Sequence, residues 1–184
     1  MRYFIAVLVV IVLIIFGVVL FSGGSKPHQP TITPKTLPDY AATDASVRLI
    51  IDGQINGDEN HRAIRITIDK NERQVDIIQG YQGSVMQTQS FGNNESAYNN
   101  FLHALVQAGF TMVRKTTQTD ETGICPLGNR YTYELDNTSD KKDFSRWSTS
   151  CGGEGTYGGQ PAFTRSLFEN QIPDYNDLTN NVQL

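Results

Sequence analysis

The sequence has 184 residues, a formal net charge of −4 at pH 7 and two cysteines, which leaves room for one globular domain beside the apolar N-terminus. Residues 40–184 hold 12 Lys and Arg against 18 Asp and Glu, and their basic pairs are confined to positions 114–115 and 141–142. A surface of this charge does not attract nucleic-acid phosphates, so we expect no nucleic-acid partner.

Residues 3–21 form an apolar run of 19 residues without charge, of which sixteen are Leu, Ile, Val or Phe. As a helix, this run covers about 28 Å of the roughly 30 Å hydrocarbon core, so we predict a transmembrane signal-anchor helix over residues 1–21. A cleaved secretory signal is the alternative, because Ser22 to Ser25 offer a small-residue site, although the run exceeds the usual length of about 7–15 residues. Arg2 favours a cytoplasmic N-terminus and an extracytoplasmic domain.

Residues 22–39 carry four of the seven prolines of the chain, together with Gly, Ser and Thr, and few apolar residues. This composition is typical of a semi-extended linker. We therefore predict a Pro-rich linker over residues 22–39, followed by an extracytoplasmic domain over residues 40–184.

The first part of the domain reads as a run of strands. Residues 47–55 end at an Asn-Gly-Asp turn, and isoleucines alternate with polar residues over positions 63–68, the period-two pattern of a half-buried antiparallel strand. Residues 74–81 and 84–91 repeat this pattern less cleanly on either side of Gly83. The economical prediction is an antiparallel meander.

A helix follows the meander. Apolar residues recur at helical spacing from Ala97 to Ala108, and the segment Asn93-Asn94-Glu95 before them supplies an N-cap and an acid in the first turn. Gly109 is placed to end the helix in the left-handed conformation, with Phe110 folding back onto it.

The second part of the domain repeats the order of strands and then a helix. We expect strands over residues 111–117, 129–136 and 143–150, the last two as a hairpin, and a second helix from Pro161 that ends by Pro173.

The predicted class is α+β, with a mostly antiparallel sheet and two helices, preceded by one N-terminal transmembrane helix. One more turn is expected over residues 174–178. The predicted core comprises Leu49, Ile51, Ile64, Ile66, Ile68, Ile77, Phe101, Leu105, Phe110, Tyr133, Trp147 and Leu167.

Cys125 and Cys151 flank the predicted hairpin, which would bring them close together, so a structural disulfide is the favoured interpretation. Two free thiols or a metal or redox role are the alternatives, but there is no second pair of cysteines for zinc and no CxxC motif. A stable disulfide indicates an oxidising compartment, which agrees with an extracytoplasmic domain.

A glycine-rich loop follows Cys151. It contains the spacing Gly153-x-Gly155-x-x-Gly158 of a dinucleotide-binding fingerprint, but an antiparallel strand precedes it and no second parallel strand follows, so we expect no cofactor. The remaining interpretations are a tight structural loop or a loop that binds a partner through an exposed Tyr157. The candidate partner-binding residues are Gly152, Gly153, Glu154, Gly155, Thr156, Tyr157, Gly158 and Gly159.

Two common catalytic motifs are missing from the sequence: there is no GxSxG and no HExxH. Residues 58–61 (Asp-Glu-Asn-His) could coordinate a cation, but their spacing matches no known loop and favours a solvated turn, so we expect no metal. His103 reads as a surface residue of the first helix. An enzyme whose site is assembled in space, gathering His61 or His103 with carboxylates, stays open as an alternative.

The segments CPLGNRYTYEL, WSTSCGGEGTYGG and FENQIPDYNDL, with LVQAGF at the end of the first helix, resemble a family of bacterial single-pass membrane-anchored envelope proteins of unknown function. This resemblance covers most of the domain and implies no activity. A weaker similarity is to the subtilisin-inhibitor-like fold, in which a disulfide also joins a strand start to a position beyond a hairpin. The sequence lacks the second disulfide and the reactive-site loop of that fold, so no inhibitory residue can be assigned.

The architecture favours a membrane-anchored, extracytoplasmic binding or interaction domain in the cell envelope, with a protein or a glycan as its partner. The first alternative is an extracellular protease inhibitor, which would show an exposed rigid loop beside the disulfide. The second is an enzyme. Architecture alone does not decide among these functions.

Overall fold

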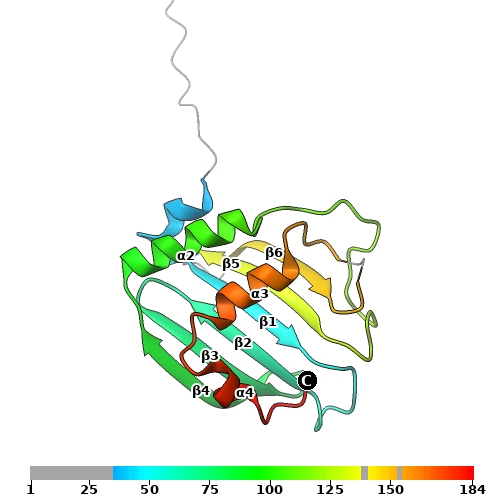
Figure 1. Ribbon diagram of the computed structural model, residues 1–184. Coiled ribbons are helices and arrows are strands. Elements are labelled where there is room, and N and C mark those ends of the chain that lie inside the picture. The colour runs from blue at the N-terminus through cyan, green and yellow to red at the C-terminus, as the bar shows by residue number, and fades with distance from the viewer. Residues whose placement is uncertain (1–34, 138–140, 153–154) are drawn as a thin grey trace, which may run out of the picture. The chain divides into compact units, whose positions relative to one another are not determined.

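The computed structural model describes residues 35–137, 141–152 and 155–184 (Figure 1). Residues 35–184 form one compact unit. The predicted transmembrane segment and most of the predicted linker lie outside the described residues. Across the described ranges, no helix is both long enough and apolar enough to span a membrane.

A six-stranded sheet forms the centre of the domain, in the order β4-β3-β2-β1-β5-β6, and every neighbouring pair is antiparallel. The first four strands form the predicted meander, and the predicted hairpin of β5 and β6 adds to β1. The α+β class with a mostly antiparallel sheet is therefore confirmed. The strands span Ser46–Asp52 (β1), Arg62–Ile68 (β2), Glu72–Gln79 (β3), Ser84–Gly92 (β4), Arg130–Asn137 (β5) and Lys141–Thr149 (β6).

Helices cover one face of the sheet (Figure 1). Both predicted helices are present, and the single turn expected over residues 174–178 forms a third, short helix, so the predicted number of two is too low. A short 3-10 helix precedes β1. The helical elements span Leu37–Tyr40 (η1), Glu95–Gln107 (α2), Pro161–Glu169 (α3) and Tyr175–Thr179 (α4).

The core lies between the helices and the sheet. In β1, residues at alternate positions are buried: Leu49 is fully buried and pairs across the sheet with Ile66 and Tyr133, which are buried too. This is the alternation that the sequence shows, because side chains in a strand point to opposite faces. Ten of the twelve predicted core residues lie in the main buried cluster. The exceptions are Leu167 and Trp147.

These two exceptions have separate causes. Leu167 is only half-buried, because Phe168 takes the central position and packs edge-on against Phe101. Trp147 is buried, but it pairs with Thr132 on the sheet face away from the helices, where its indole N–H donates to the carbonyl oxygen of Thr119. The connection between α2 and β5 therefore shields this part of the open face.

The ends of α2 are those that the sequence predicts. The side chain of Asn94 accepts a hydrogen bond from the backbone N–H of Ala97. At the other end, Gly109 has a φ of +74° and its N–H donates to the Val106 oxygen, while the N–H of Phe110 donates to the Leu105 oxygen. This pair of bonds is a Schellman motif, and it turns the buried Phe110 into the core.

The strand predicted over residues 111–117 is wrong. Only Val113 forms a β-bridge, and its partner is Tyr157 rather than a strand of the sheet. The backbone of Arg114 donates to Thr156, and that of Gly158 donates to Met112. The hydrogen-bonding groups of this segment are thus used by the glycine-rich loop, which no local pattern indicates.

Candidate functional site

The disulfide between Cys125 and Cys151 is present, with the two Cα atoms 5.7 Å apart, as predicted. It joins the start of the β5–β6 hairpin to the residue that follows β6. Both cysteines of the chain are used in this bond, so neither is a free thiol.

The glycine-rich loop after this disulfide does not display Tyr157. The expectation of an exposed aromatic contact is wrong: Tyr157 is 1% exposed, its ring stacks on that of Tyr133, and its hydroxyl lies 2.6 Å from that of Thr164. Gly153 and Glu154 lie outside the described residues, and Gly155 is buried. The role of the loop in binding a partner stays a prediction.

Close packing explains three glycines of this loop, Gly155, Gly158 and Gly159. A Cβ atom on Gly155 would meet the carbonyl oxygen of Trp147, and Gly155 has a φ of +116°. A Cβ on Gly158 would lie 2.8 Å from the backbone carbon of Val113, and one on Gly159 would lie 2.6 Å from the Gly109 oxygen. Gly155 and Gly158, two of the three glycines in the spacing that resembles a nucleotide fingerprint, therefore allow one backbone to approach another closely.

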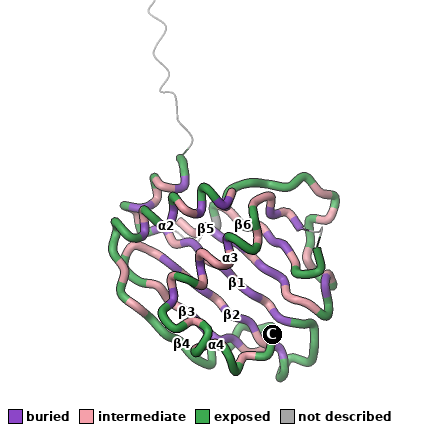
Figure 2. Tube along the Cα trace, viewed as in Figure 1, coloured by how far each residue is buried: buried purple, intermediate pink, exposed green. Residues whose placement is uncertain are grey.

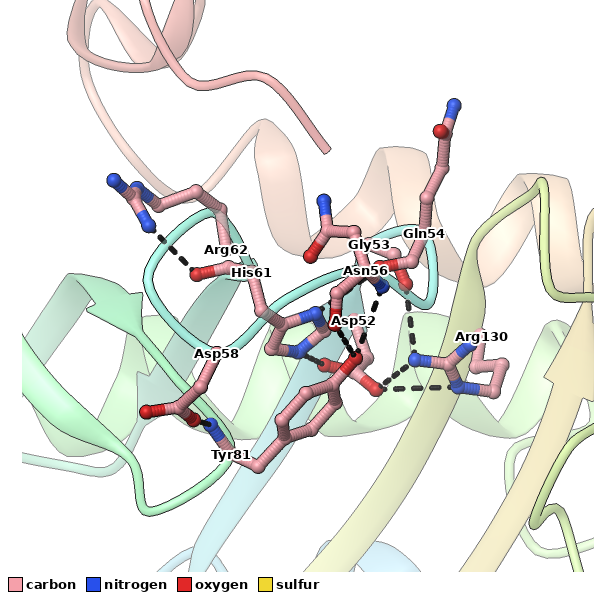
Figure 3. A network of polar contacts seen from close by, with 9 residues as sticks. All are labelled: Asp52, Gly53, Gln54, Asn56, Asp58, His61, Arg62, Tyr81 and Arg130. Atoms are coloured by element: carbon pink, nitrogen blue, oxygen red, sulfur yellow. Dashed lines mark hydrogen bonds and ion pairs between the residues drawn. The ribbon is translucent and has the colours of Figure 1, made fainter.

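A second cluster, which sequence reasoning missed, lies at the end of β1 on the open face of the sheet (Figure 3). Its centre is His61, which is 2% exposed rather than part of a solvated turn. His61 Nε2 lies 2.7 Å from Asp52 Oδ1, and Nδ1 lies 3.1 Å from the backbone oxygen of Gln54. As a neutral ring, His61 could donate to only one of these two acceptors.

Asp52 also binds the guanidinium of Arg130. The Nε of Arg130 donates to Asp52 Oδ2 at 3.2 Å, and Nη2 donates to the same oxygen and, at 2.9 Å, to the carbonyl oxygen of Gly53. Arg130 is 5% exposed, whereas the side chain of Asp52 is 30% exposed, so this ion pair is only partly shielded from water. The carboxylate of Asp52, at the end of β1, thus contacts both Arg130 of β5 and His61, the last residue of the loop before β2.

Tyr81 closes the cluster from the β3–β4 turn. Its ring stacks on His61, its hydroxyl donates to the Asn56 oxygen at 2.9 Å and accepts from the Asn56 N–H at 3.1 Å, and its own N–H donates to Asp58. Figure 3 shows these contacts converging on the loop over residues 53–61. Although most of this loop is exposed, its backbone is held at several points.

Glu121 lies near the same cluster. Burial raises the pKa of its carboxyl group, and the neighbouring negative charge of Asp52 raises it further, against the opposing effect of Arg130. Within the described part of the chain, Glu121 Oε2 and Arg130 Nη1 are buried atoms without a hydrogen-bond partner.

The loop over residues 53–61 forms one wall of a surface hollow with a volume of about 500 Å³. The opposite wall is the C-terminal segment, where Val182 and Leu184 pack against the core. That segment passes close to Gly53, since a Cβ there would lie 2.8 Å from the carbonyl carbon of Leu184. The hollow is lined by Gln54, Asn56, Asn60, Arg62, Asn181, Gln183 and Leu184.

Carboxamide side chains dominate the lining of this hollow. Five of the seven residues carry a carboxamide, one a guanidinium and one an aliphatic chain, and none has a carboxylate in its side chain. We call this the carboxamide hollow. Arg62 is partly engaged, because its Nη1 donates to the backbone oxygens of Glu59 and His61 at 2.7 and 2.8 Å.

Two other hollows have different linings. One lies between α3 and α4 and includes the carboxyl groups of Glu169, Asp174 and Asp177. The other lies between β6, which contributes Arg146, and the exposed chain after α2, which contributes Arg114. The carboxamide hollow differs from both in that its wall rests on the buried cluster of His61.

No metal centre emerges from the described ranges, in which no three His, Cys, Asp or Glu side chains are placed to hold an ion. His103 is exposed on α2. No protein-family model matches the chain, and no curated protein matches it in sequence.

Proposed function

We propose that this chain is a single-pass membrane protein whose extracytoplasmic domain binds a neutral, hydroxyl-rich ligand, a glycan, in the carboxamide hollow. The observation that carries the proposal is the lining of that hollow, with five carboxamides and no side-chain carboxylate. The membrane anchor rests on the apolar run of residues 3–21. The extracytoplasmic location is supported by the disulfide, which favours an oxidising compartment.

Carboxamides suit hydroxyl groups. Each Asn or Gln side chain offers two N–H donors and a carbonyl acceptor, and a sugar hydroxyl both donates and accepts. Neighbouring carboxamides can therefore engage neighbouring hydroxyls without placing a net charge in the site. Arg62 is the only charged side chain in the lining, and its bonds to Glu59 and His61 oxygens direct part of its guanidinium away from a ligand.

The wall of the hollow is organised before a ligand arrives. Tyr81 holds the backbone of Asn56 by two hydrogen bonds, and Nδ1 of His61 lies 3.1 Å from the backbone oxygen of Gln54. A loop that is already ordered loses less conformational entropy on binding, which favours affinity. The ion pair of Asp52 with Arg130 thus supports the binding residues without lining the hollow itself.

An enzyme that uses His61 is less well supported. Both ring nitrogens lie within hydrogen-bond distance of protein acceptors, and the side chain is almost wholly buried. A general base needs a nitrogen within reach of a substrate proton. In this arrangement we assign His61 a positioning role.

A protease inhibitor is the second candidate, and it rests on Leu127. This residue is 81% exposed and lies two positions after Cys125 of the disulfide. However, the N–H of Gly128 donates to the Cys125 oxygen, so Leu127 sits in a closed turn, whereas a chain that enters a protease cleft is extended. Inhibition of an extracellular serine protease that is lost in Leu127→Ala would favour this candidate over glycan binding.

The proposal is tested by titrating the full chain in detergent with neutral oligosaccharides and following binding by calorimetry. Asn60→Ala and Gln183→Ala remove one carboxamide from each wall of the hollow, and we expect each to weaken binding several-fold. Asn100→Ala removes an exposed carboxamide from α2 and serves as the matched control. Binding that is unchanged in both hollow variants, or no binding of any neutral oligosaccharide, contradicts the proposal.

A further inference from the structure

The two edge strands of the sheet, β4 and β6, differ in how far other parts of the chain cover them. At β6, the N–H of Tyr157 donates to the Trp147 oxygen at 2.9 Å, so the glycine-rich loop covers part of that edge. At β4, the outermost strand on the other side, every residue from Ser84 to Ser90 is exposed (Figure 2). An open edge carries backbone groups that can pair with another strand.

The register tells which backbone groups of β4 are directed outward. The N–H of Asn93 donates to the Asn71 oxygen at 2.8 Å, and hydrogen-bonded pairs alternate with non-bonded pairs along an antiparallel ladder. Gln89, four positions before Asn93, therefore bonds toward β3. The amides and carbonyls of Thr88 and Ser90, on either side of it, are directed toward the free side.

The distribution of charged residues among the strands indicates which kind of partner β4 can pair with. Each of the other five strands contains at least one charged residue, whereas β4 reads SVMQTQSFG, without charge or proline. Charged residues and proline on an edge normally oppose pairing between molecules. In a domain with an excess of acidic residues, two copies meet with least repulsion where the seam is neutral.

We propose that two copies of this chain pair through β4, antiparallel, about a two-fold axis at Gln89. In this register, Thr88 of one copy lies opposite Ser90 of the other, so the outward backbone groups of both residues find partners. The two Gln89 residues face each other as a non-bonded pair. The register shift between β3 and β4 falls between Val85 and Gln87, outside the central residues Thr88 to Ser90 of this pairing. Such an interface is symmetric and closes on itself, which favours a dimer over a fibre.

The pairing is independent of the carboxamide hollow, none of whose lining residues belongs to β4. A dimer would still form if the hollow bound no glycan, and a monomer could still bind one. If both hold, two hollows on one dimer would bind a repeating glycan more tightly than one hollow does.

A cysteine placed at the axis tests the register. Non-bonded antiparallel pairs have Cα atoms about 4.5 Å apart, within the range of about 4.4–6.8 Å that a disulfide allows. The full chain with Gln89→Cys, in detergent under mild oxidation, should give a covalent dimer on a non-reducing gel. Gln107→Cys, at the exposed end of α2, is the matched control and should stay monomeric. The absence of a covalent dimer with Gln89→Cys overturns the proposal.

A charge exchange gives a second, independent readout. Gln89→Lys and Gln89→Glu each place like charges opposite each other at the axis, which destabilises a cross-strand pair. We expect each variant alone to lose the dimer in sedimentation velocity, and an equal mixture of the two to regain it. A wild-type chain that is monomeric, or a dimer that persists in both variants alone, overturns the pairing through β4.

Discussion

The ring of His61 lies on the ring of Tyr81, with centroids 4.0 Å apart and planes 14° from parallel. This contact joins the loop before β2 to the turn after β3. Tyr81 then holds Asn56 through its hydroxyl, and His61 holds Gln54 through Nδ1. The carboxamides of one wall of the hollow are thus placed by two residues that do not line it.

This relationship predicts the effect of Tyr81→Phe. The variant keeps the ring but removes both hydrogen bonds to the backbone of Asn56, which should lower the free energy of unfolding by about 1 kcal/mol. Hydrogen exchange should speed up at the amides of residues 54–60 and stay unchanged in β1. Tyr40→Phe removes one tyrosine hydrogen bond, to Asp143, elsewhere in the domain and serves as the control. Unchanged exchange in Tyr81→Phe would show that the loop is held by other contacts.

The packing of the glycine-rich loop predicts that Gly155→Ala is strongly destabilising. The added Cβ would overlap the carbonyl oxygen of Trp147, and φ is +116° at this position. We expect a loss of about 2–3 kcal/mol in urea unfolding. Gly57→Ala, where no atom lies within 4 Å of the added Cβ, should change stability little. Equal effects of the two substitutions would contradict the packing described for this loop.

We expect the ionised carboxylate of Asp76 to stabilise the fold at neutral pH and to lose this effect in acid. Burial alone would raise its pKa, but hydrogen bonds from Thr88, Arg65 and Gln74 outweigh burial and hold the pKa below its usual value of 3.8. A lowered pKa stabilises the fold above about pH 4, and this stabilisation disappears as the pH falls through the folded-state value. Asp76→Asn should therefore cost about 2 kcal/mol at pH 7, and the difference from wild type should shrink toward pH 2.

The control for this substitution is Asp44→Asn, because Asp44 is an exposed residue whose ion pair with Lys70 lies at the surface. Its effect on the unfolding midpoint should be small at every pH, since exposed ion pairs contribute little. A difference between Asp76→Asn and wild type that does not vary with pH would mean that the carboxylate charge is not what stabilises this part of the sheet.

We expect Glu121 to have the opposite effect on how the stability of the fold depends on pH. Its pKa is raised above 4.5, chiefly by burial and then by Asp52, so the folded state binds its proton more tightly than the unfolded state does. Stability is then lost as the pH rises from about 4.5 through the raised pKa. Glu121→Gln should raise the melting temperature at pH 7 and change it less at pH 4, while exposed Glu72→Gln should show no such pattern. A lower melting temperature for Glu121→Gln at pH 7 would refute this account of the cluster.

Local patterns of sequence predict much of this fold. Alternating isoleucines identify β2, and Asn94 and Gly109 mark the two ends of α2, because strand periodicity and helix caps depend on neighbouring residues alone. The disulfide followed from the position of two cysteines around one hairpin.

The candidate site depends on residues that are distant in the sequence. Asp52 meets Arg130, 78 positions later, only because β1 pairs with β5. The burial of His61 follows from that pairing and from Tyr81, so a turn rich in polar residues concealed a buried histidine. Likewise, the glycines around Tyr157 indicated a close approach, but nothing local shows whether a ligand or another part of the backbone fills the space.

The most direct test of glycan binding is to follow the side-chain amide signals of the full chain in detergent by 15N–1H NMR while a neutral oligosaccharide is added. If glycans bind in the carboxamide hollow, the added sugar should cause saturable shifts in the carboxamide signals of the lining residues, and the Asn100 signal should not move. These lining signals are identified because each disappears from the spectrum when its residue is replaced. Shifts confined to backbone amides outside residues 53–62 and 180–184, or no shift at saturating sugar, would contradict binding in the carboxamide hollow.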